Sequence, residues 1–230
     1  MQLKLRLKKK KEQKSEQKLS SFQKVSLYAL QKQKQAIELK EWLVVAGFIG
    51  IASMLRALMQ GLPNVEPLTF FAVLAGWLFG KKKGAIVGMS SLYVSNFFVI
   101  GGQGPWTIIQ AAAFGIAGFL GGFLRKNSTV FETVVVMFVS SLISQIIFNI
   151  GWGILIGFNI LLAFATGLIF TIIHIVSNTI FGLFLPKARK FVYEKGDFNE
   201  KELCDQYISH INSINAGFDT GGLKAAKKQH

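Results

Sequence analysis

The sequence predicts an all-α membrane protein in which six transmembrane helices form one bundle and both termini lie in the cytoplasm. The 230-residue chain is 51% hydrophobic and only 17% charged, with a mean hydropathy of +0.41, which is far from the composition of an average soluble domain. Apolar stretches recur along its middle. Of the 26 lysine and arginine residues, all except Arg56 fall where six crossings would place them in the cytoplasm. The positive-inside rule therefore predicts both the class and the orientation.

Each predicted helix is an apolar run that ends at turn-forming or basic residues. A membrane span needs about 20 apolar residues, and fewer suffice where neighbouring helices bury the segment. The predicted spans cover residues 42–60, 67–79, 85–100, 106–124, 130–150 and 160–185. We expect Lys81–Lys83 to lie in a cytoplasmic loop, a Gly-Trp-Gly segment at 151–153 to break the fifth helix, and Pro186 to close the sixth.

Polar tails flank the predicted transmembrane domain, which covers residues 41–190. Residues 1–40 are rich in Lys and Gln, and they predict either a disordered segment or an amphipathic helix on the inner leaflet. Residues 191–230 predict a short cytoplasmic helix and a disordered end. Because the net charge of +14 lies in the tails and loops, we expect contact with anionic lipid headgroups rather than nucleic acid. The single Cys204 excludes an intramolecular disulfide.

Enzymatic chemistry has little support in this sequence. The predicted spans contain no cluster of metal-ligating residues, no phosphate-binding glycine loop and no nucleophile–base pair at a diagnostic spacing. His174 is the only histidine in the spans, and we expect it to be a hydrogen-bonded packing residue rather than a ligand. The sequence therefore predicts a protein that is not an enzyme, with no cofactor and no metal.

Polar side chains gather in the half of the spans that should face outward. Ionisable groups within a membrane are candidates for function, and here Arg56 near the end of the first span could pair with Glu66 across the turn. Such a pair could equally be structural and lock the first hairpin. The predicted binding residues are Arg56, Asn64, Glu66, Trp106, Thr107, Gln110, Asn149 and Trp152, with the further amides Asn96, Gln103, Gln145 and Asn159 on the same side. Amides and indoles around one possible ion pair suit an uncharged or zwitterionic organic solute.

Several short segments carry a resemblance to a known family. These are residues 64–69 (NVEPLT), 74–80 (LAGWLFG), 95–98 (SNFF) and 102–107 (GQGPWT), followed by Gln110. From about residue 41 to residue 190 the chain resembles the substrate-specific S components of energy-coupling factor (ECF) vitamin transporters. The Gly-Pro-Trp-Thr segment is the most specific part, and it is similar to a subgroup with cobalamin-type substrates.

The resemblance implies a function and a set of partners. An S component binds its vitamin at the outer face, through the first loop and the outer ends of helices four to six. It then associates with a transmembrane coupling protein and two cytoplasmic ATPase subunits, and itself hydrolyses nothing. A pair of alanines four residues apart on the first helix contacts the coupling protein in this family. Ala46 and Gly50 have that spacing here, with Gly in place of the second Ala.

Two other classes remain open from the sequence alone. The first is an integral-membrane enzyme that acts on lipid or isoprenoid substrates, with Arg56, Glu66 and His174 as its polar groups. Against it, we expect His174 to lie deeper than the other two, so that the three do not converge. The second is a membrane assembly protein that binds no solute, in which the amides only bridge helices.

Overall fold

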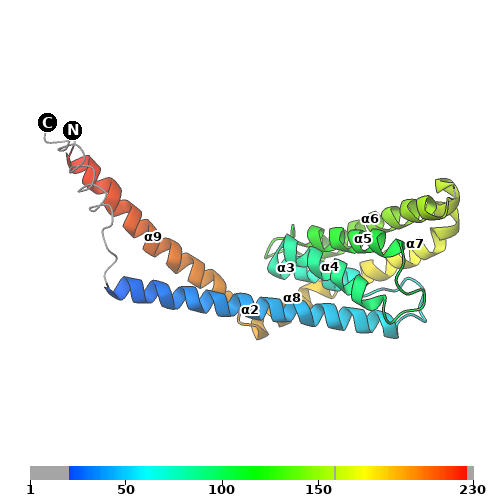
Figure 1. The fold of residues 1–230 in the computed structure, drawn as a ribbon. Coiled ribbons are helices and arrows are strands. Elements are labelled where there is room, and N and C mark those ends of the chain that lie inside the picture. Colours follow the sequence, from blue (N-terminus) through cyan, green and yellow to red (C-terminus); the bar gives the residue numbers. More distant parts are fainter. Residues whose placement is uncertain (1–20, 158, 227–230) are drawn as a thin grey trace. The chain divides into compact units, whose positions relative to one another are not determined.

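Every regular element in the described part of the chain, residues 21–157 and 159–226, is a helix in the computed structural model (Figure 1). The helices are α2 (Ser21–Leu58), α3 (Leu68–Phe79), α4 (Lys81–Ser95), α5 (Trp106–Gly121), α6 (Val130–Ile156), α7 (Ile160–Gly182), α8 (Leu185–Lys195) and α9 (Asn199–Ala226). The chain divides into two compact units, residues 1–40 with 197–230, and residues 41–196. The predicted all-helical class is confirmed.

Three helices are long and apolar enough to cross a membrane. They are Phe22–Leu58 in α2, Val130–Ile156 in α6 and Ile160–Gly182 in α7. Helices α3 and α5 are also apolar but shorter, with 12 and 16 residues. Because a span needs about 20 residues, length and composition identify a helical membrane protein with at least these three candidate spans.

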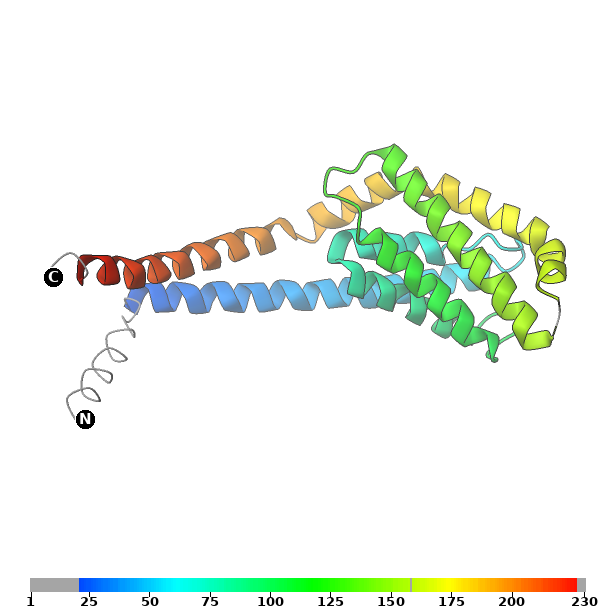
Figure 2. The ribbon, with the colours of Figure 1, turned by 90° about the horizontal axis from the view of Figure 1, so that it is seen from above.

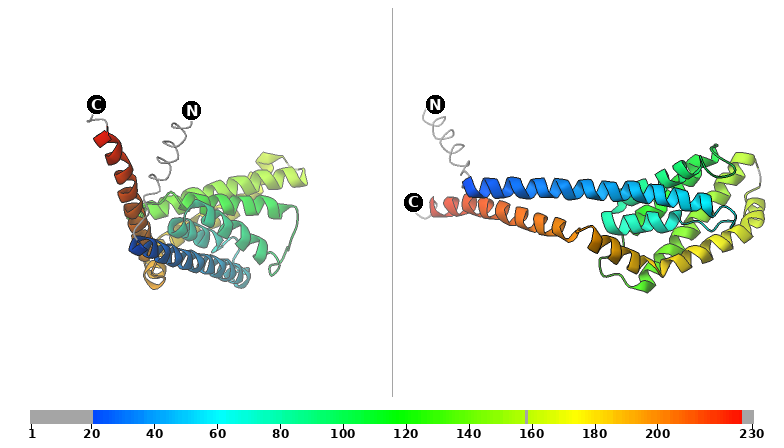
Figure 3. Two further views of the ribbon diagram at one scale, coloured as in Figure 1. Left: turned by 60° about the vertical axis from the view of Figure 1, so that its left-hand side comes forward. Right: turned by 90° about the horizontal axis from the view of Figure 1, so that it is seen from below.

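The first unit contains the start of α2 and all of α9. The two helices come close where Lys34 pairs with Asp205 at 2.6 Å, and away from this point they diverge (Figures 1 and 3). Ile37, Phe198 and Cys204 are buried in this unit. The short helix predicted in the C-terminal tail is thus much longer than expected. Of the predicted tails, residues 1–20 and 227–230 lie outside the described residues.

The second unit contains three neighbouring helices, α3, α4 and α5 (Figure 2), which touch through glycines. A Cβ atom added to Gly84 would overlap main-chain atoms of Gly76 and Gly118, and one added to Gly88 would overlap the carbonyl group of Phe114. Such small residues let helix backbones approach closely. The turn between α3 and α4 is a single residue, Gly80, whose φ of 89° favours glycine.

The three lysines at 81–83 do not form a loop, so that prediction is wrong. They make the first turn of α4, where the positive end of the helix dipole disfavours cations. Two contacts offset this cost. Lys83 pairs with Glu41, and the ammonium group of Lys81 lies 5.4 Å and 3.3 Å from the ring centroids of Phe119 and Phe123.

Two predicted helix ends are also wrong. The Gly-Trp-Gly segment does not break α6, because Gly151 lies against the Ile109 side chain, where a Cβ atom would come within 2.5 Å of Cγ2. The helix ends instead at Gly157, with a left-handed φ of 69°. Pro186 does not close α7, which ends at Gly182. It lies in the first turn of α8, where its fixed φ and missing N–H are tolerated.

Helices α6 and α7 pack antiparallel, and polar residues run along the interface between them. Thr133 donates to the Gly182 carbonyl at 3.1 Å at one end, and Asn149 donates to the Thr171 hydroxyl at 3.3 Å near the other. Between these points α6 and α7 carry the buried polar residues Ser140, Ser141, Ser144, Gln145, His174 and Asn178, of which Ser144 donates to the Ala113 carbonyl on α5 at 3.4 Å. A polar seam of this kind is costly in an apolar bundle unless its groups find partners, and it leads to the candidate site.

Candidate functional site

A cavity of about 430 Å³ opens at the Asn149 end of the α6–α7 seam. Its walls come from α5, α6, α7 and the loop that follows α2. The lining residues are Asn64, Trp106, Ile109, Gln110, Gln145, Phe148, Asn149, Trp152, Leu155, Ala163, Thr166, Gly167 and Phe170. None of them is charged, so the cavity combines apolar and aromatic walls with neutral amide and hydroxyl groups. Its volume lies within the usual range of small-molecule sites, about 300–1,000 Å³.

Hydrogen bonds fix the amides at the seam. Asn149 Nδ2 donates to the Gln145 carbonyl at 2.8 Å and to the Thr171 hydroxyl at 3.3 Å. The Thr171 hydroxyl in turn donates to Gln145 Oε1 at 3.3 Å. Gln145 and Asn149 are both buried. The relay therefore holds the amides of two cavity-lining residues in defined orientations.

Two indoles line the cavity on neighbouring helices. The rings of Trp106 on α5 and Trp152 on α6 meet edge to face, with centroids 6.1 Å apart. Trp106 Nε1 donates to the Gly102 carbonyl at 3.4 Å. Gly104 lies against the same ring, because a Cβ atom there would overlap it. The Gly-rich segment before α5 thus packs against the Trp106 indole and accepts its N–H.

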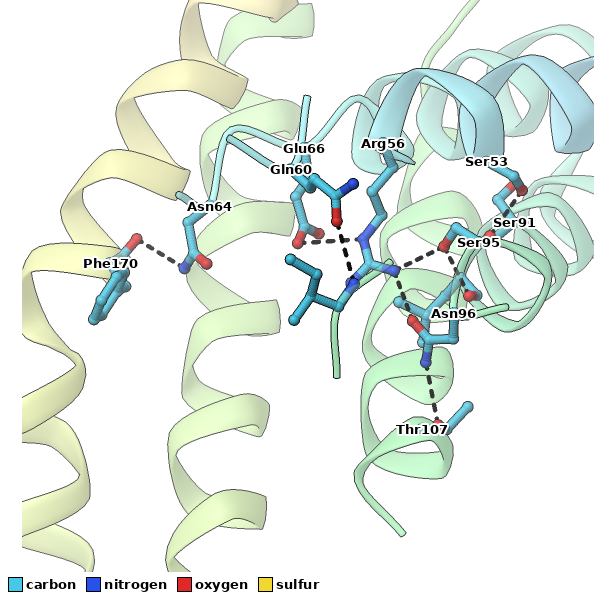
Figure 4. Close-up of polar contacts among 12 residues, drawn as sticks. Ser53, Arg56, Gln60, Asn64, Glu66, Ser91, Ser95, Asn96, Thr107 and Phe170 are labelled. Carbon is cyan, nitrogen blue, oxygen red and sulfur yellow. Dashed lines mark hydrogen bonds and ion pairs between the residues drawn. The ribbon is translucent and has the colours of Figure 1, made fainter. Parts of the chain in front are cut away.

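Arg56 lies outside this cavity, in a network of its own (Figure 4). Its Nη1 atom donates to Ser95 Oγ at 2.8 Å and to Asn96 Oδ1 at 2.6 Å, and its Nε atom lies 3.4 Å from Glu66 Oε1. The expected Arg56–Glu66 pair is therefore present. The arginine side chain is only 12% exposed, and these partners tie α2 to the end of α4 and to the loop before α3.

Thr107 belongs to the same network rather than to the cavity. Its hydroxyl oxygen accepts from Asn96 Nδ2 and from the Gly104 main-chain N–H, both at 3.1 Å. Arg56 and Glu66 line a second, smaller cavity of about 220 Å³ beside the loop after α2. Asn64 borders both cavities, has a left-handed φ of 57°, and donates from Nδ2 to the Phe170 carbonyl at 3.1 Å.

The structure thus divides the eight predicted binding residues into groups. Those that share the main cavity are Asn64, Trp106, Gln110, Asn149 and Trp152. Arg56 and Glu66 border the second cavity, and Thr107 borders neither of the two. The prediction missed the α7 wall and did not select Gln145. A signal was available for Gln145, because residues 145, 149 and 152 recur at the spacing of one helix face.

His174 is buried but lacks the hydrogen bonds that were expected of it. It is 1% exposed beside the rings of Phe114 and Phe148, and neither ring nitrogen makes a hydrogen bond of normal geometry to a described residue. His174 lines neither of these two cavities, so it shares neither of them with Arg56 and Glu66.

The pair predicted to contact a coupling protein lies on an exposed face of α2. Ala46 and Gly50 are both exposed, and a Cβ atom added to Gly50 would have no neighbour within 4 Å. Large apolar residues on the same helix are also exposed, including Leu43 and Met54. The pair therefore takes no part in the close packing of the second unit.

Comparison with known families gives one match. A model of DUF6580, described as a family of unknown function, matches residues 37–196, a range that contains both cavities. No curated protein and no solved structure matches the chain.

Proposed function

Because the chain belongs to DUF6580, a family of unknown function, we propose its function from the cavity itself: the protein is a membrane-embedded subunit that binds an uncharged organic solute. The carrying observation is a cavity of about 430 Å³ with aromatic walls, oriented amides and no charged lining residue. Apolar walls with a few placed polar groups are typical of small-molecule sites. Rings of repeated carbonyls or carboxylates, as in ion filters, are not part of its lining.

The resemblance to S components gives this proposal its wider setting. In it the protein spans the cell membrane six times, keeps both termini in the cytoplasm, and captures a vitamin or related micronutrient at the outer face. A transmembrane coupling protein and two ATPase subunits complete the importer, and the subunit itself catalyses no reaction. The exposed small residues Ala46 and Gly50 support the coupling contact, because they leave room for a second helix to approach closely.

The cavity volume bears on the choice of solute. Drug-sized ligands fill pockets of about 300–1,000 Å³, and this cavity lies in the lower part of that range. Cobalamin, with its corrin ring and nucleotide tail, is much larger than a drug-sized ligand and would be enclosed only in part. The volume therefore favours a smaller vitamin than the cobalamin-type substrate that the subgroup resemblance implies.

The two competing functions have weaker support. An enzyme built on Arg56, Glu66 and His174 would need a substrate to reach all three, but His174 lines neither cavity. The Arg56 guanidinium is also already engaged by three side chains. A pure assembly protein would leave the open, amide-lined cavity without a role.

Mass spectrometry of small molecules that co-purify with the full-length protein tests the proposal. The wild-type protein should retain a solute, and Trp106→Ala and Gln110→Ala should retain less. Losing a buried hydrogen bond costs about 1–3 kcal/mol, which corresponds to roughly 5- to 150-fold in affinity. Gln103→Ala is the matched control, because the Gln103 amide bonds the Tyr93 carbonyl outside the cavity. Equal retention by all variants would place the site elsewhere. If the wild-type protein retains no solute and also binds none of the vitamins added to it, solute binding is refuted.

A further inference from the structure

The ion pair at the second cavity has unused hydrogen-bonding groups. Arg56 donates from Nη1 to Ser95 and Asn96, and its Nε atom pairs with Glu66 Oε1. The third guanidinium nitrogen, Nη2, makes no hydrogen bond to a described residue, and neither does Glu66 Oε2. One cationic donor and one anionic acceptor are therefore left for a ligand.

Both of these atoms are accessible. The Arg56 and Glu66 side chains are 12% and 19% exposed, and both line the second cavity of about 220 Å³. Among the described residues, Ser91 Oγ and Gln145 Nε2 are examples of polar atoms that lack a partner and are fully enclosed, whereas Arg56 Nη2 and Glu66 Oε2 are not enclosed in this way. Because Arg56 Nε and Glu66 Oε1 are only 3.4 Å apart, the guanidinium and the carboxylate lie side by side (Figure 4). One small molecule in the cavity can thus reach both groups.

The charges of the pair determine which ligands it favours. Arg56 and Glu66 together are neutral, so a lone carboxylate would meet the attraction of Arg56 and the repulsion of Glu66 at similar distances. A lone ammonium group meets the opposite combination. A zwitterion avoids both repulsions, because its carboxylate can approach the guanidinium while its ammonium group approaches the Glu66 carboxylate. It also brings no net charge into a largely desolvated site.

We propose that the second cavity is a binding site for a small zwitterionic α-amino acid. The ligand carboxylate accepts from Arg56 Nη2, and the ligand ammonium group donates to Glu66 Oε2. An α-amino acid carries these two groups on one carbon, which matches a guanidinium and a carboxylate that lie side by side. The site is separate from the main cavity, since Asn64 is the only described residue that lines both. The inference goes beyond the proposed function and does not depend on it.

The other walls indicate the kind of side chain that the amino acid carries. Apart from the ion pair, Gln60 and Asn64, the lining residues are apolar, namely Met59, Leu62, Pro63, Val65, Val99 and Ile100. The cavity volume of about 220 Å³ is below the range of about 300–1,000 Å³ that is usual for drug-sized ligands. The site therefore fits a short aliphatic side chain, such as that of valine, better than an aromatic or charged one.

Three probes of similar shape separate the contributions of the two charges. L-Valine carries both groups, isovalerate lacks the ammonium group, and isobutylamine lacks the carboxylate. Calorimetry on the full-length wild-type protein at pH 7, with detergent alone as the blank, should show the tightest binding for L-valine. Each of the other two should bind about 10- to 150-fold more weakly, because each loses a hydrogen bond between charged groups. Equal affinity for the three probes, or no binding of L-valine, would overturn the inference.

Glu66→Gln assigns the two hydrogen bonds. This substitution keeps the size of the side chain and removes its charge, so it should weaken L-valine and isobutylamine. The same variant should bind isovalerate more tightly than the wild type, because the repulsion of the carboxylate is gone. A gain of this kind cannot come from a loss of the fold. Gln103→Leu, outside both cavities, should change none of the three, and unchanged binding of all three by Glu66→Gln would overturn the assignment.

Competition with the co-purifying solute separates this inference from the proposed function. L-Valine should bind to the wild-type protein without releasing that solute, and release would overturn the second site by placing L-valine in the main cavity. A protein that retains a solute but binds no L-valine refutes only this inference. A protein that binds L-valine with the predicted preference, but neither retains a solute nor binds an added vitamin, refutes only the proposed function.

Discussion

Replacing Gly118 with alanine tests the glycine-mediated contact between α4 and α5. A Cβ atom at this position would lie 2.9 Å from the Ala85 main-chain nitrogen and closer still to the Gly84 carbonyl, whereas ordinary contact begins at 3.4 Å. The obstacle is main chain, so no side chain can rotate away and the two helices must separate. Overpacking of this kind costs about 1–3 kcal/mol, and a rigid obstacle places it at the upper end.

The higher helix propensity of alanine offsets part of this destabilisation. Alanine is a better helix former than glycine by about 0.5–1 kcal/mol, which leaves a net destabilisation of about 2 kcal/mol for Gly118→Ala. For a chain of this size that corresponds to a fall in Tm of about 4–8 °C. Thermal unfolding of the purified protein, followed by tryptophan fluorescence, measures the difference.

Gly50→Ala is the matched control for the same measurement. An added Cβ atom at Gly50 meets nothing within 4 Å, so only the gain in helix propensity remains, and Tm should stay constant or rise. The reasoning is refuted if Gly118→Ala keeps the wild-type Tm. It is equally refuted if the two substitutions lower Tm by the same amount, because the geometry around them differs.

Three further predictions concern orientation, coupling and the buried histidine. In a Cys204→Ser background, an impermeant thiol reagent applied outside the cell should label Gln103→Cys but not Lys82→Cys, and external labelling at 82 would end the six-span topology. Gly50→Leu should abolish uptake while the purified protein still binds its solute, because the larger side chain holds a coupling helix away; loss of binding as well would place the residue in the internal packing. His174→Leu should keep or raise Tm, since neither ring nitrogen makes a normal hydrogen bond to a described residue and an apolar side chain of similar size leaves no unpaired group; a lower Tm would show that the histidine has a stabilising partner.

Much of the cavity could be predicted from spacing along single helices. Trp106 and Gln110 are four residues apart, and Asn149 and Trp152 are three apart, so each pair shares a helix face. Neighbouring residues do not share a face, and for this reason Thr107 turns away from the cavity beside Trp106. Its hydroxyl instead accepts from Asn96 and from the loop before α5.

The α7 wall could not be predicted in the same way. Ala163 and Gly167 contribute by being small, and a missing side chain carries no chemical signal in an apolar sequence. The contact between Asn64 and the Phe170 carbonyl joins residues 106 positions apart, a distance over which local patterns hold no information. Two predicted helix ends were wrong for a related reason. Glycine and proline are common in turns, but here Gly151 packs against Ile109 within α6 and Pro186 lies in the first turn of α8.

The Asn64–Phe170 hydrogen bond also has a consequence for the order of folding. Helices α3, α4 and α5 are consecutive, so their glycine contacts need only short loops to close and can form early. The cavity needs α7, the last of its walls to be synthesised, together with a loop made much earlier. A nascent chain that has not yet completed α7 therefore lacks one wall of the cavity. Because a ligand stabilises only the state that binds it, a solute bound in this cavity would stabilise only molecules in which α7 is in place.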